Sequence, residues 1–389
     1  MGTGNPLEAR VRRRLAQWDA AGLLRVLQPP AGIDFSSNDY LNLSRHPLIV
    51  ERFSRAVSAD GVGSTGSRLL RGDRNAFRLV ERRVADLKRT ERALYFSSGY
   101  LANLSVMTVL AGEGDVVFSD ERNHASLIDG IRLSRAARVI FPHNDPVRLA
   151  QLIAETPVSP AGHRFVVVES LFSMDGDVAP LAEYAAVCRS TGASLVVDEA
   201  HAVGVYGARG SGLIEAAGIE ADVCVSINTA GKALGVSGAF VCGPDWAIED
   251  LAQRARPFVF STAAPPALAA AIDASLDVLS QEPERREALS SRVRYLRGQL
   301  NRAGVPVATE GSQIIPIPIG GNAPAVAVSR AMQAAGCDVR AIRPPSVPVG
   351  TARLRVSVNV GLSDEVLEEF AGTLASALRE VGLCSAESS

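Results

Sequence analysis

The sequence predicts an α/β protein with a large, mostly parallel, seven-stranded sheet and a smaller α+β domain at the C-terminus. Between residues 93 and 242, seven short apolar runs alternate with helical patterns, as expected of parallel strands covered on both faces. After residue 282 this alternation stops. The expected strands of the large sheet are residues 93–97, 115–119, 138–142, 164–169, 194–198, 221–227 and 238–242.

Three parts are expected along the chain. Residues 1–45 form an N-terminal helix and arm, residues 46–284 the large α/β domain, and residues 285–389 the small domain. The apolar spacing predicts an amphipathic helix over residues 7–27, ended by Pro29-Pro30. The other helices that we expect outside the alternating region span residues 47–59, 75–88, 292–303, 324–335 and 363–381, and the strands of the small domain span 313–319, 339–342 and 353–358.

Composition narrows the possible partners. The chain is 47% hydrophobic and 21% charged with a net charge of -2, so no electrostatic argument favours nucleic acid or an anionic membrane. Its five cysteines show no CxxC spacing, which suits reduced thiols, and no metal site is predicted. No signal peptide and no membrane-length apolar run is evident, so a cytoplasmic location is the default expectation.

One lysine stands in a loop of small residues between the last two expected strands. Lys232 is flanked by Gly231, Gly235 and Gly238, which let a ligand approach the backbone closely. A desolvated lysine amine loses its proton more easily and can act as a nucleophile or a base. Lys232 is therefore a candidate Schiff-base lysine; the alternative is a loop lysine that pairs with a carboxylate or tops a helix.

Other candidate residues follow the carboxyl ends of the strands, where α/β proteins bind ligands. Residues 96–100 open a helix whose free amides suit a phosphate, His124 could stack on an aromatic ring, and Ser173 could donate a hydrogen bond. Taken singly, the first is better explained by an ordinary strand–helix turn and the second by a hydrogen-bonded loop histidine.

Charged side chains are the remaining candidate site residues. Asp198 ends a buried apolar strand and needs a partner, such as a protonated pyridine nitrogen, while His201 could reach a phenolic oxygen on the same ring. The alternative is a structural Asp–His pair. Arg343, Arg353 and Arg355 offer planar forks for carboxylates, or surface ion pairs, with one of the last two left for a structural role. Together, these groups describe a site for pyridoxal 5′-phosphate (PLP) and an amino acid.

Five stretches of the sequence resemble the α-oxoamine synthases, which are fold-type I PLP enzymes. They are Ser-Asn-Asp-Tyr at 37–40, His-Asn-Asp at 143–145, Phe-Ser-Met-Asp-Gly-Asp at 172–177, Asp-Glu-Ala-His at 198–201 and Gly-Lys-Ala-Leu-Gly-Val-Ser-Gly-Ala at 231–239. The resemblance covers residues 33 to 380, and residues 341–355 are most similar to the family member of biotin biosynthesis. It implies a decarboxylative condensation of L-alanine with a pimeloyl thioester, carried by coenzyme A (acyl-CoA) or an acyl carrier protein (acyl-ACP).

The resemblance also implies a role for each matching residue. Lys232 is the Schiff-base lysine and acts as the base, Asp198 pairs with the pyridine nitrogen, and His124 stacks on the ring. The remaining cofactor contacts are His201 and Ser173 at the ring oxygen and Ser98, Gly99, Tyr100 and Thr229 at the phosphate.

Two further sets follow from the same resemblance. Ser261 and Thr262 would reach the phosphate of a neighbouring subunit, which implies a homodimer with a shared active site. The substrate or product carboxylates would be handled by Asn38, Arg343 and Arg355. The sequence departs from the family at Ala230, Ala202-Val203 and Asn42, the last in place of a frequent glycine. These departures leave the acyl donor open.

Three rival functions stay open at this point. A sister acyltransferase would use glycine or serine in place of alanine. A nicotinamide-binding oxidoreductase would use residues 61–66, which match G-x-G-x-x-G but follow a helix-like stretch instead of a strand. A PLP-binding regulator without turnover would need a DNA-binding segment, which the sequence lacks.

Overall fold

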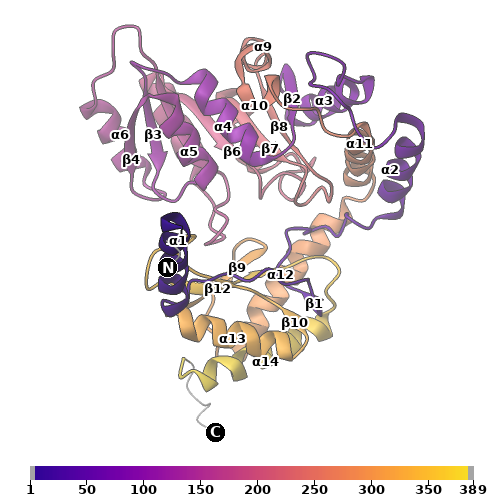
Figure 1. Ribbon diagram of the computed structural model, residues 1–389, viewed down its shortest axis with the longest axis vertical. Helices are drawn as coiled ribbons and strands as arrows, with labels where there is room; N and C mark the ends of the chain where they lie inside the picture. Colours follow the sequence, from indigo (N-terminus) through magenta and orange to yellow (C-terminus); the bar gives the residue numbers. More distant parts are fainter. Residues whose placement is uncertain (1–4, 384–389) are drawn as a thin grey trace. The chain divides into compact units, whose positions relative to one another are not determined.

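The computed structural model describes residues 5–383, which divide into two compact units (Figure 1). The larger unit holds residues 38–173 and 177–289. The smaller unit holds the described residues up to 37, residues 174–176 and the residues from 290 onward. The N-terminal arm therefore groups with the C-terminal part of the chain.

The larger unit is built on one seven-stranded sheet, as the sequence predicts, with strand bounds that differ from the predicted ones by at most two residues. The strand order is β2-β8-β7-β6-β5-β3-β4. Only β8 runs antiparallel to its neighbours, and the other six strands point the same way. The strands are β2 (Arg92–Phe96), β3 (Val116–Asp120), β4 (Ala137–Phe141), β5 (Arg164–Glu169), β6 (Ser194–Asp198), β7 (Val223–Thr229) and β8 (Ala239–Gly243).

This topology decides where a site can form. The six parallel strands end at one edge of the sheet, and β8 begins at that same edge. We call it the carboxyl edge. It gathers the segments that follow the strands, so residues far apart in the sequence meet there.

Helices cover the sheet, and Figure 1 shows α4 and α5 lying across it. Residues of α4, α5 and α9 form one apolar core with β2, β3, β5, β6, β7 and β8. The helices of the larger unit are α2 (Pro47–Asp60), α3 (Asn75–Lys88), α4 (Gly99–Leu110), α5 (Ala125–Ser134), α6 (Pro146–Glu155), α7 (Leu181–Thr191), α8 (Leu213–Ala217), α9 (Asp245–Arg254), α10 (Arg256–Val259), α11 (Pro266–Gln281) and the first turns of α12 (Glu284–Arg302).

A glycine sets the close packing of α4 against α5. A Cβ at Gly130 would lie 2.9 Å from the Cβ of Met107 and 3.1 Å from the carbonyl oxygen of Asn103. Only a hydrogen side chain leaves room for this approach. Ser126 lies one turn before Gly130 on the same face of α5, so the close packing also brings Ser126 next to Asn103.

Asn42 stands where the related motif frequently has glycine, and asparagine fits the backbone conformation at this position. Its φ is +54°, in the left-handed region. Asparagine is one of the few residues other than glycine that adopt this conformation readily. The substitution therefore preserves the turn.

The smaller unit contains two small sheets. Strands β11 (Ala341–Ile342), β12 (Ala352–Ser357) and β9 (Ile314–Gly320) pair antiparallel, and β1 (Ile33–Asp34) pairs parallel with β10 (Cys337–Asp338). The rest of α12, α13 (Asn322–Ala334) and α14 (Asp364–Glu380) accompany them. Phe35 stacks on Phe370 with ring centroids 3.9 Å apart.

The N-terminal helix is shorter than predicted. Helix α1 spans Pro6–Ala20, and no residue in it is buried. Gly22 adopts a φ of +65°, and the N–H of Leu23 donates to the carbonyl of Trp18 at 2.7 Å. This Schellman arrangement ends the helix before Pro29 is reached. In residues 5–383, no helix combines the length and the apolar character needed to cross a bilayer.

Candidate active site

A buried carboxylate stands at the end of the central strand β6. Asp198 is 5% exposed, and its two oxygens accept hydrogen bonds from the backbone N–H of Ala200 at 2.8 Å and from Nδ2 of Asn103 at 2.6 Å. No lysine, arginine or histidine among residues 5–383 forms an ion pair with it. A buried carboxylate gains most from a cationic partner, so this position suits a positively charged ligand atom.

Lys232 lies in a closed loop between β7 and β8. Its Nζ atom is 2.7 Å from Nε2 of His201. The loop is held by backbone hydrogen bonds from Ala230 N to Gly238 O at 2.8 Å and from Val236 N to Ala230 O at 2.9 Å. A Cβ at Gly235 would lie 2.5 Å from the backbone nitrogen of Ser44, so the loop needs glycine there.

The sequence contains only two lysines, and the structure separates their roles. Lys88 is 3% exposed, and its amine is bound to the carboxylate of Glu199 and to the carbonyl of Ser211. Lys232 keeps part of its surface exposed. Lys232 is therefore the lysine amine that a ligand can reach at the carboxyl edge.

The second nitrogen of His201 is also occupied. The hydroxyl of Tyr40 lies 2.7 Å from Nδ1 of His201 and 3.0 Å from Oδ1 of Asn38. Tyr40 is fully buried. The structure thus brings Asn38, His201 and Lys232, three residues that the sequence analysis singled out, into one hydrogen-bonded group.

Glu169 ends β5 directly beside Asp198, its register partner on β6. It is 3% exposed, its Oε1 atom has no hydrogen-bond partner within the described residues, and the backbone of His124 and Ser173 lies near its carboxyl group. Burial, and then the negative charge of Asp198, raise the pKa of Glu169 well above its usual range. Glu169 therefore lies beside two predicted ring contacts, and its carboxyl group favours the protonated form.

The predicted phosphate contacts lie at the start of α4 and the end of β7. The side chain of Ser98 caps α4 by accepting from the N–H of Leu101, and a Cβ on Gly99 would lie 3.9 Å from the Cβ of Thr229. The amides of this helix start can therefore face an anion together with Thr229. The hydroxyl of Tyr100, on the same helix, donates to the carboxylate of Asp129.

Ser261 and Thr262 lie exposed in the loop between α10 and α11. The next residues tie this loop to the loop between α2 and α3. Ala263 N donates to Gly66 O at 2.9 Å, and Ser64 Oγ donates to Ala264 O at 2.5 Å.

The two substrate arginines belong to the smaller unit. Arg355 is 8% exposed on β12 and donates to Oγ of Ser357 at 2.8 Å. Arg353, on the same strand face, pairs with Asp175, which gives it the structural role left open for one of the pair. Arg343 donates to the carbonyl oxygens of Gly22 and Leu24 in the N-terminal arm.

A histidine clamp stands near the loop that carries Ser173. His143 donates from Nδ1 to Asp120 at 2.9 Å and from Nε2 to Asp177. Burial opposes a charge on this ring, but the hydrogen bonds and charges of Asp120 and Asp177 outweigh burial and raise the pKa of His143 to about 9. The clamp joins the end of β3 to the end of that loop.

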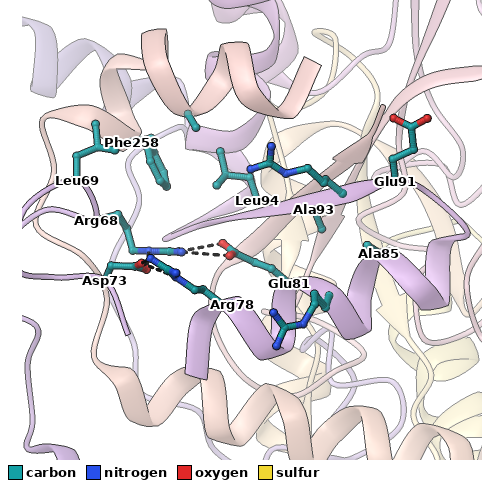
Figure 2. Close-up of a pocket in the computed structure, with 13 residues that line it drawn as sticks. Arg68, Leu69, Asp73, Arg78, Glu81, Ala85, Glu91, Ala93, Leu94 and Phe258 are labelled. Carbon is teal, nitrogen blue, oxygen red and sulfur yellow. Dashed lines mark hydrogen bonds and ion pairs between the residues drawn. The ribbon is translucent and has the colours of Figure 1, made fainter. Parts of the chain in front are cut away.

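A separate pocket of about 390 Å³ lies at the opposite end of β2 (Figure 2). Arg68 donates there to both oxygens of Glu81, at 2.9 and 3.1 Å, and to Asp73 at 2.7 Å. These bonds use the donors of the Arg68 guanidinium within the protein. The ion pairs stabilise the pocket, which lies away from the candidate residues at the carboxyl edge. The G-x-G-x-x-G match at residues 61–66 follows helix α2 directly, and so lacks the strand that a dinucleotide fingerprint requires.

Four residues of this site were missed or left without a role in the sequence analysis: Tyr40, Asn103, Ser126 and Glu169. A signal existed for Glu169, because it ends an apolar strand just as Asp198 does. Tyr40 belongs to the Ser-Asn-Asp-Tyr stretch at 37–40 but received no role of its own. Asn103 and Ser126 are polar residues inside helices that no sequence pattern marks.

Comparisons with known proteins agree with this geometry. Residues 30–374 match the family described as aminotransferase class I and II. The chain is similar to 8-amino-7-oxononanoate synthases from Marinobacter nauticus, with 44% identity over 93% of this chain and 95% of the relative, and from Methylococcus capsulatus, with 46% identity over 91% of each. A solved serine palmitoyltransferase variant from S. paucimobilis, with PLP and myriocin bound, superposes with a TM-score of 0.90 at 30% identity, over 97% of this chain and 100% of that one.

Proposed function

Because the chain belongs to the aminotransferase class I and II family, we propose that it is a PLP-dependent acyltransferase that condenses L-alanine with a pimeloyl thioester. The products are 8-amino-7-oxononanoate, carbon dioxide and the free thiol of coenzyme A or an acyl carrier protein. The observation that carries the proposal is the buried carboxylate of Asp198, which forms no ion pair within residues 5–383, at the same sheet edge as the reachable amine of Lys232.

The residues at the carboxyl edge fit PLP. Asp198 offers an anion to the pyridine nitrogen, and the backbone N–H groups at the start of α4, beside Thr229, offer donors to the phosphate. Lys232 offers an amine for the aldehyde carbon, and the predicted ring contacts His124 and Ser173 lie beside Glu169. No positively charged side chain competes for Asp198 among residues 5–383.

When bound, the cofactor supplies an electron-poor ring that accepts the electron pair left on Cα of the amino acid. Asp198 holds the proton on the pyridine nitrogen that makes the ring electron-poor. Lys232 removes the proton from Cα of alanine and later returns a proton to that carbon. His201 contacts the lysine amine through Nε2, and Tyr40 fixes the ring of His201 through Nδ1.

Bond changes balance as follows. A carbon–carbon bond forms between Cα of alanine and the thioester carbonyl carbon, and the carbon–sulfur bond breaks to release the thiol. The carboxylate of alanine then leaves as carbon dioxide. Asn38, Arg343 and Arg355 are proposed to orient the carboxylates of substrate and product.

We also propose a homodimer with a shared site, in which Ser261 and Thr262 reach the phosphate bound to the partner. Their exposed loop is tied to the loop between α2 and α3, and the two loops expose large apolar side chains. Val62, Leu70 and Phe260 are 80%, 82% and 73% exposed. Side chains of this kind gain from burial against a second copy of the chain.

The direct test uses the purified, PLP-loaded protein with L-alanine and pimeloyl-CoA. We expect carbon dioxide and free thiol in equal amounts, and a product with the mass of 8-amino-7-oxononanoate. Glycine or serine in place of alanine, and palmitoyl-CoA in place of pimeloyl-CoA, separate the sister activities. A preference for serine with palmitoyl-CoA, or a protein that binds no PLP, would overturn the proposal. Turnover with pimeloyl-ACP alone would assign the donor.

A further inference from the structure

A chain of hydrogen bonds runs from Asp198 on β6 to His124 at the start of α5. Nδ2 of Asn103 donates to Oδ2 of Asp198 at 2.6 Å and to Oγ of Ser126 at 2.9 Å. Oγ of Ser126 lies 2.7 Å from Nδ1 of His124. Asn103 and Ser126 are 2% and 0% exposed, so bulk water does not compete for these bonds.

The acceptor Asp198 sets the direction of the first two bonds in this chain. A carboxylate only accepts hydrogen bonds, so the amide nitrogen of Asn103 must face Asp198. The second hydrogen of that nitrogen points to Ser126, which makes Oγ of Ser126 an acceptor. The single hydroxyl proton of Ser126 is then left for His124.

Nδ1 of His124 consequently receives two donors. Besides the hydroxyl of Ser126, the backbone N–H of Ser126 points at it from 3.3 Å. A ring nitrogen that accepts carries no proton of its own. The backbone N–H of Ser126 thus places the ring proton on Nε2, and a charged ring would lose that bond and reverse the one with Oγ of Ser126.

We propose that Asn103 and Ser126 are positioning residues that hold His124 in its neutral form, protonated on Nε2, for contact with the cofactor ring. This inference rests on the proposed function, in which His124 stacks on PLP. A neutral imidazole can lie against a protonated pyridine ring without the repulsion that an imidazolium would meet. The same amide of Asn103 also donates to one oxygen of Asp198. One buried side chain therefore orients both Asp198 and, through Ser126, His124 toward the cofactor ring.

The charges around His124 act in the same direction. It is faced by Asp198 from β6, Lys232 from the β7–β8 loop, Glu169 from β5 and the ring of Tyr100 from α4, whose centroid lies 6.4 Å away. Loss of surrounding water lowers the pKa of His124, and the charge of Lys232 lowers it further against the opposing charge of Asp198. The neutral form is thus favoured by the surroundings as well as by the bonds.

Nitrogen NMR of histidine-labelled protein tests the proposal. The chain has five histidines, so a His124→Gln variant identifies the signals of His124. In the wild-type protein, with and without PLP, we expect Nδ1 at the shift of an unprotonated nitrogen and Nε2 at that of a protonated one. The ring should stay neutral well below its ordinary pKa of about 6.5.

Ser126→Ala removes the hydroxyl donor. We expect its His124 to titrate closer to the ordinary value, to show a mixture of the two neutral forms, and to bind PLP about tenfold more weakly, as for the loss of one buried hydrogen bond. Ser126→Thr keeps a hydroxyl and is expected to keep the wild-type nitrogen shifts. Asn103→Leu is expected to reproduce the effects of Ser126→Ala.

Ser105→Ala is the matched control. Ser105 is also a fully buried serine, on α4, but within the described part of the chain its hydroxyl has no hydrogen-bond partner. We expect unchanged shifts and PLP affinity. A protonated Nδ1 in the wild type, or shifts that stay unchanged in Ser126→Ala, would overturn the proposal. The shifts of the PLP-free protein test it even if the proposed acyl transfer is not found.

Discussion

Nζ of Lys232 lies 2.7 Å from Nε2 of His201, whose other ring nitrogen is 2.7 Å from the buried hydroxyl of Tyr40. The contact orients a lysine amine at the carboxyl edge of the sheet. The other lysine of the chain, Lys88, is bound to Glu199 inside the larger unit. This division leads to a simple test of which amine holds the cofactor.

Replacing Lys232 with alanine is expected to lower turnover about a thousandfold or more, because it removes both the nucleophile and the base. Borohydride reduction of the PLP-loaded wild-type protein, followed by mass spectrometry of its peptides, should find the cofactor on the peptide that contains Lys232. The peptide with Lys88 is the internal control. Cofactor mass on Lys88, or full turnover in the alanine variant, would refute the assignment.

Replacing Glu169 with glutamine is expected to be tolerated, because its raised pKa favours a neutral side chain at this position. Alanine, in contrast, leaves a cavity at this buried position and should cost about 2 kcal/mol or more of unfolding free energy. Chemical denaturation measures both variants.

The pH dependence of Glu169→Gln has a definite sign. A carboxyl group whose folded pKa is raised destabilises the fold progressively as pH rises above its unfolded pKa of about 4.3. The glutamine variant lacks this loss. The wild type should therefore lose stability relative to the variant as pH rises from about 4. A constant difference across this range would show that Glu169 is ionised in the fold.

Replacing His143 with glutamine should destabilise the larger unit at neutral pH. The pKa of His143 is raised to about 9, so its charge stabilises the fold fully below about 6.5 and this contribution is lost as pH passes 9. We expect a cost of about 2 kcal/mol at pH 7 that shrinks above pH 9. The exposed His163, replaced in the same way, is the control. A cost that does not change with pH would argue for packing alone.

Mixing two inactive variants tests the shared site. Thr262→Asp should repel the phosphate bound to a partner, and Lys232→Ala lacks the base. In a hybrid dimer, one site would combine the intact Lys232 of one copy with the intact Thr262 of the other. We expect activity to return after the two variants are unfolded and refolded together. Continued inactivity of a hybrid dimer that does form would contradict a shared site.

Arg355 and Arg353 are expected to respond differently to substitution by lysine. Arg353 pairs with Asp175 within the smaller unit, so its variant should lose stability and keep the KM for alanine and the donor. Arg355→Lys loses the planar fork and should raise a substrate KM about tenfold or more, with a small change in stability. Equal changes in KM for both variants would show that the two arginines share one role.

The sheet and its chemistry could be predicted because both depend on local signals. The strands are continuous apolar runs, and Asp198 and Lys232 stand out as single charges among apolar or small residues. The predicted end of α1 was too late. The helix ends where the chain turns at Gly22 with a positive φ, and the apolar spacing does not reveal this turn.

Asn103 and Ser126 could not be predicted for a different reason. They are ordinary polar residues within two helices, twenty-three positions apart, and their bond exists because Gly130 lets the helices approach closely. The sequence identified the groups that would touch the cofactor, but the residues that orient those groups depend on helix packing.

The antiparallel direction of β8 also affects how the cofactor-free protein binds PLP. Thr229 and Ala239 pair across the sheet, so the segment bearing Lys232 is fastened at both ends and is already ordered before vitamin B6 arrives. Little folding then has to accompany capture. Reconstitution should run at a speed set by diffusion and carbonyl chemistry, with a rate proportional to the concentration of added vitamer and no slow unimolecular lag.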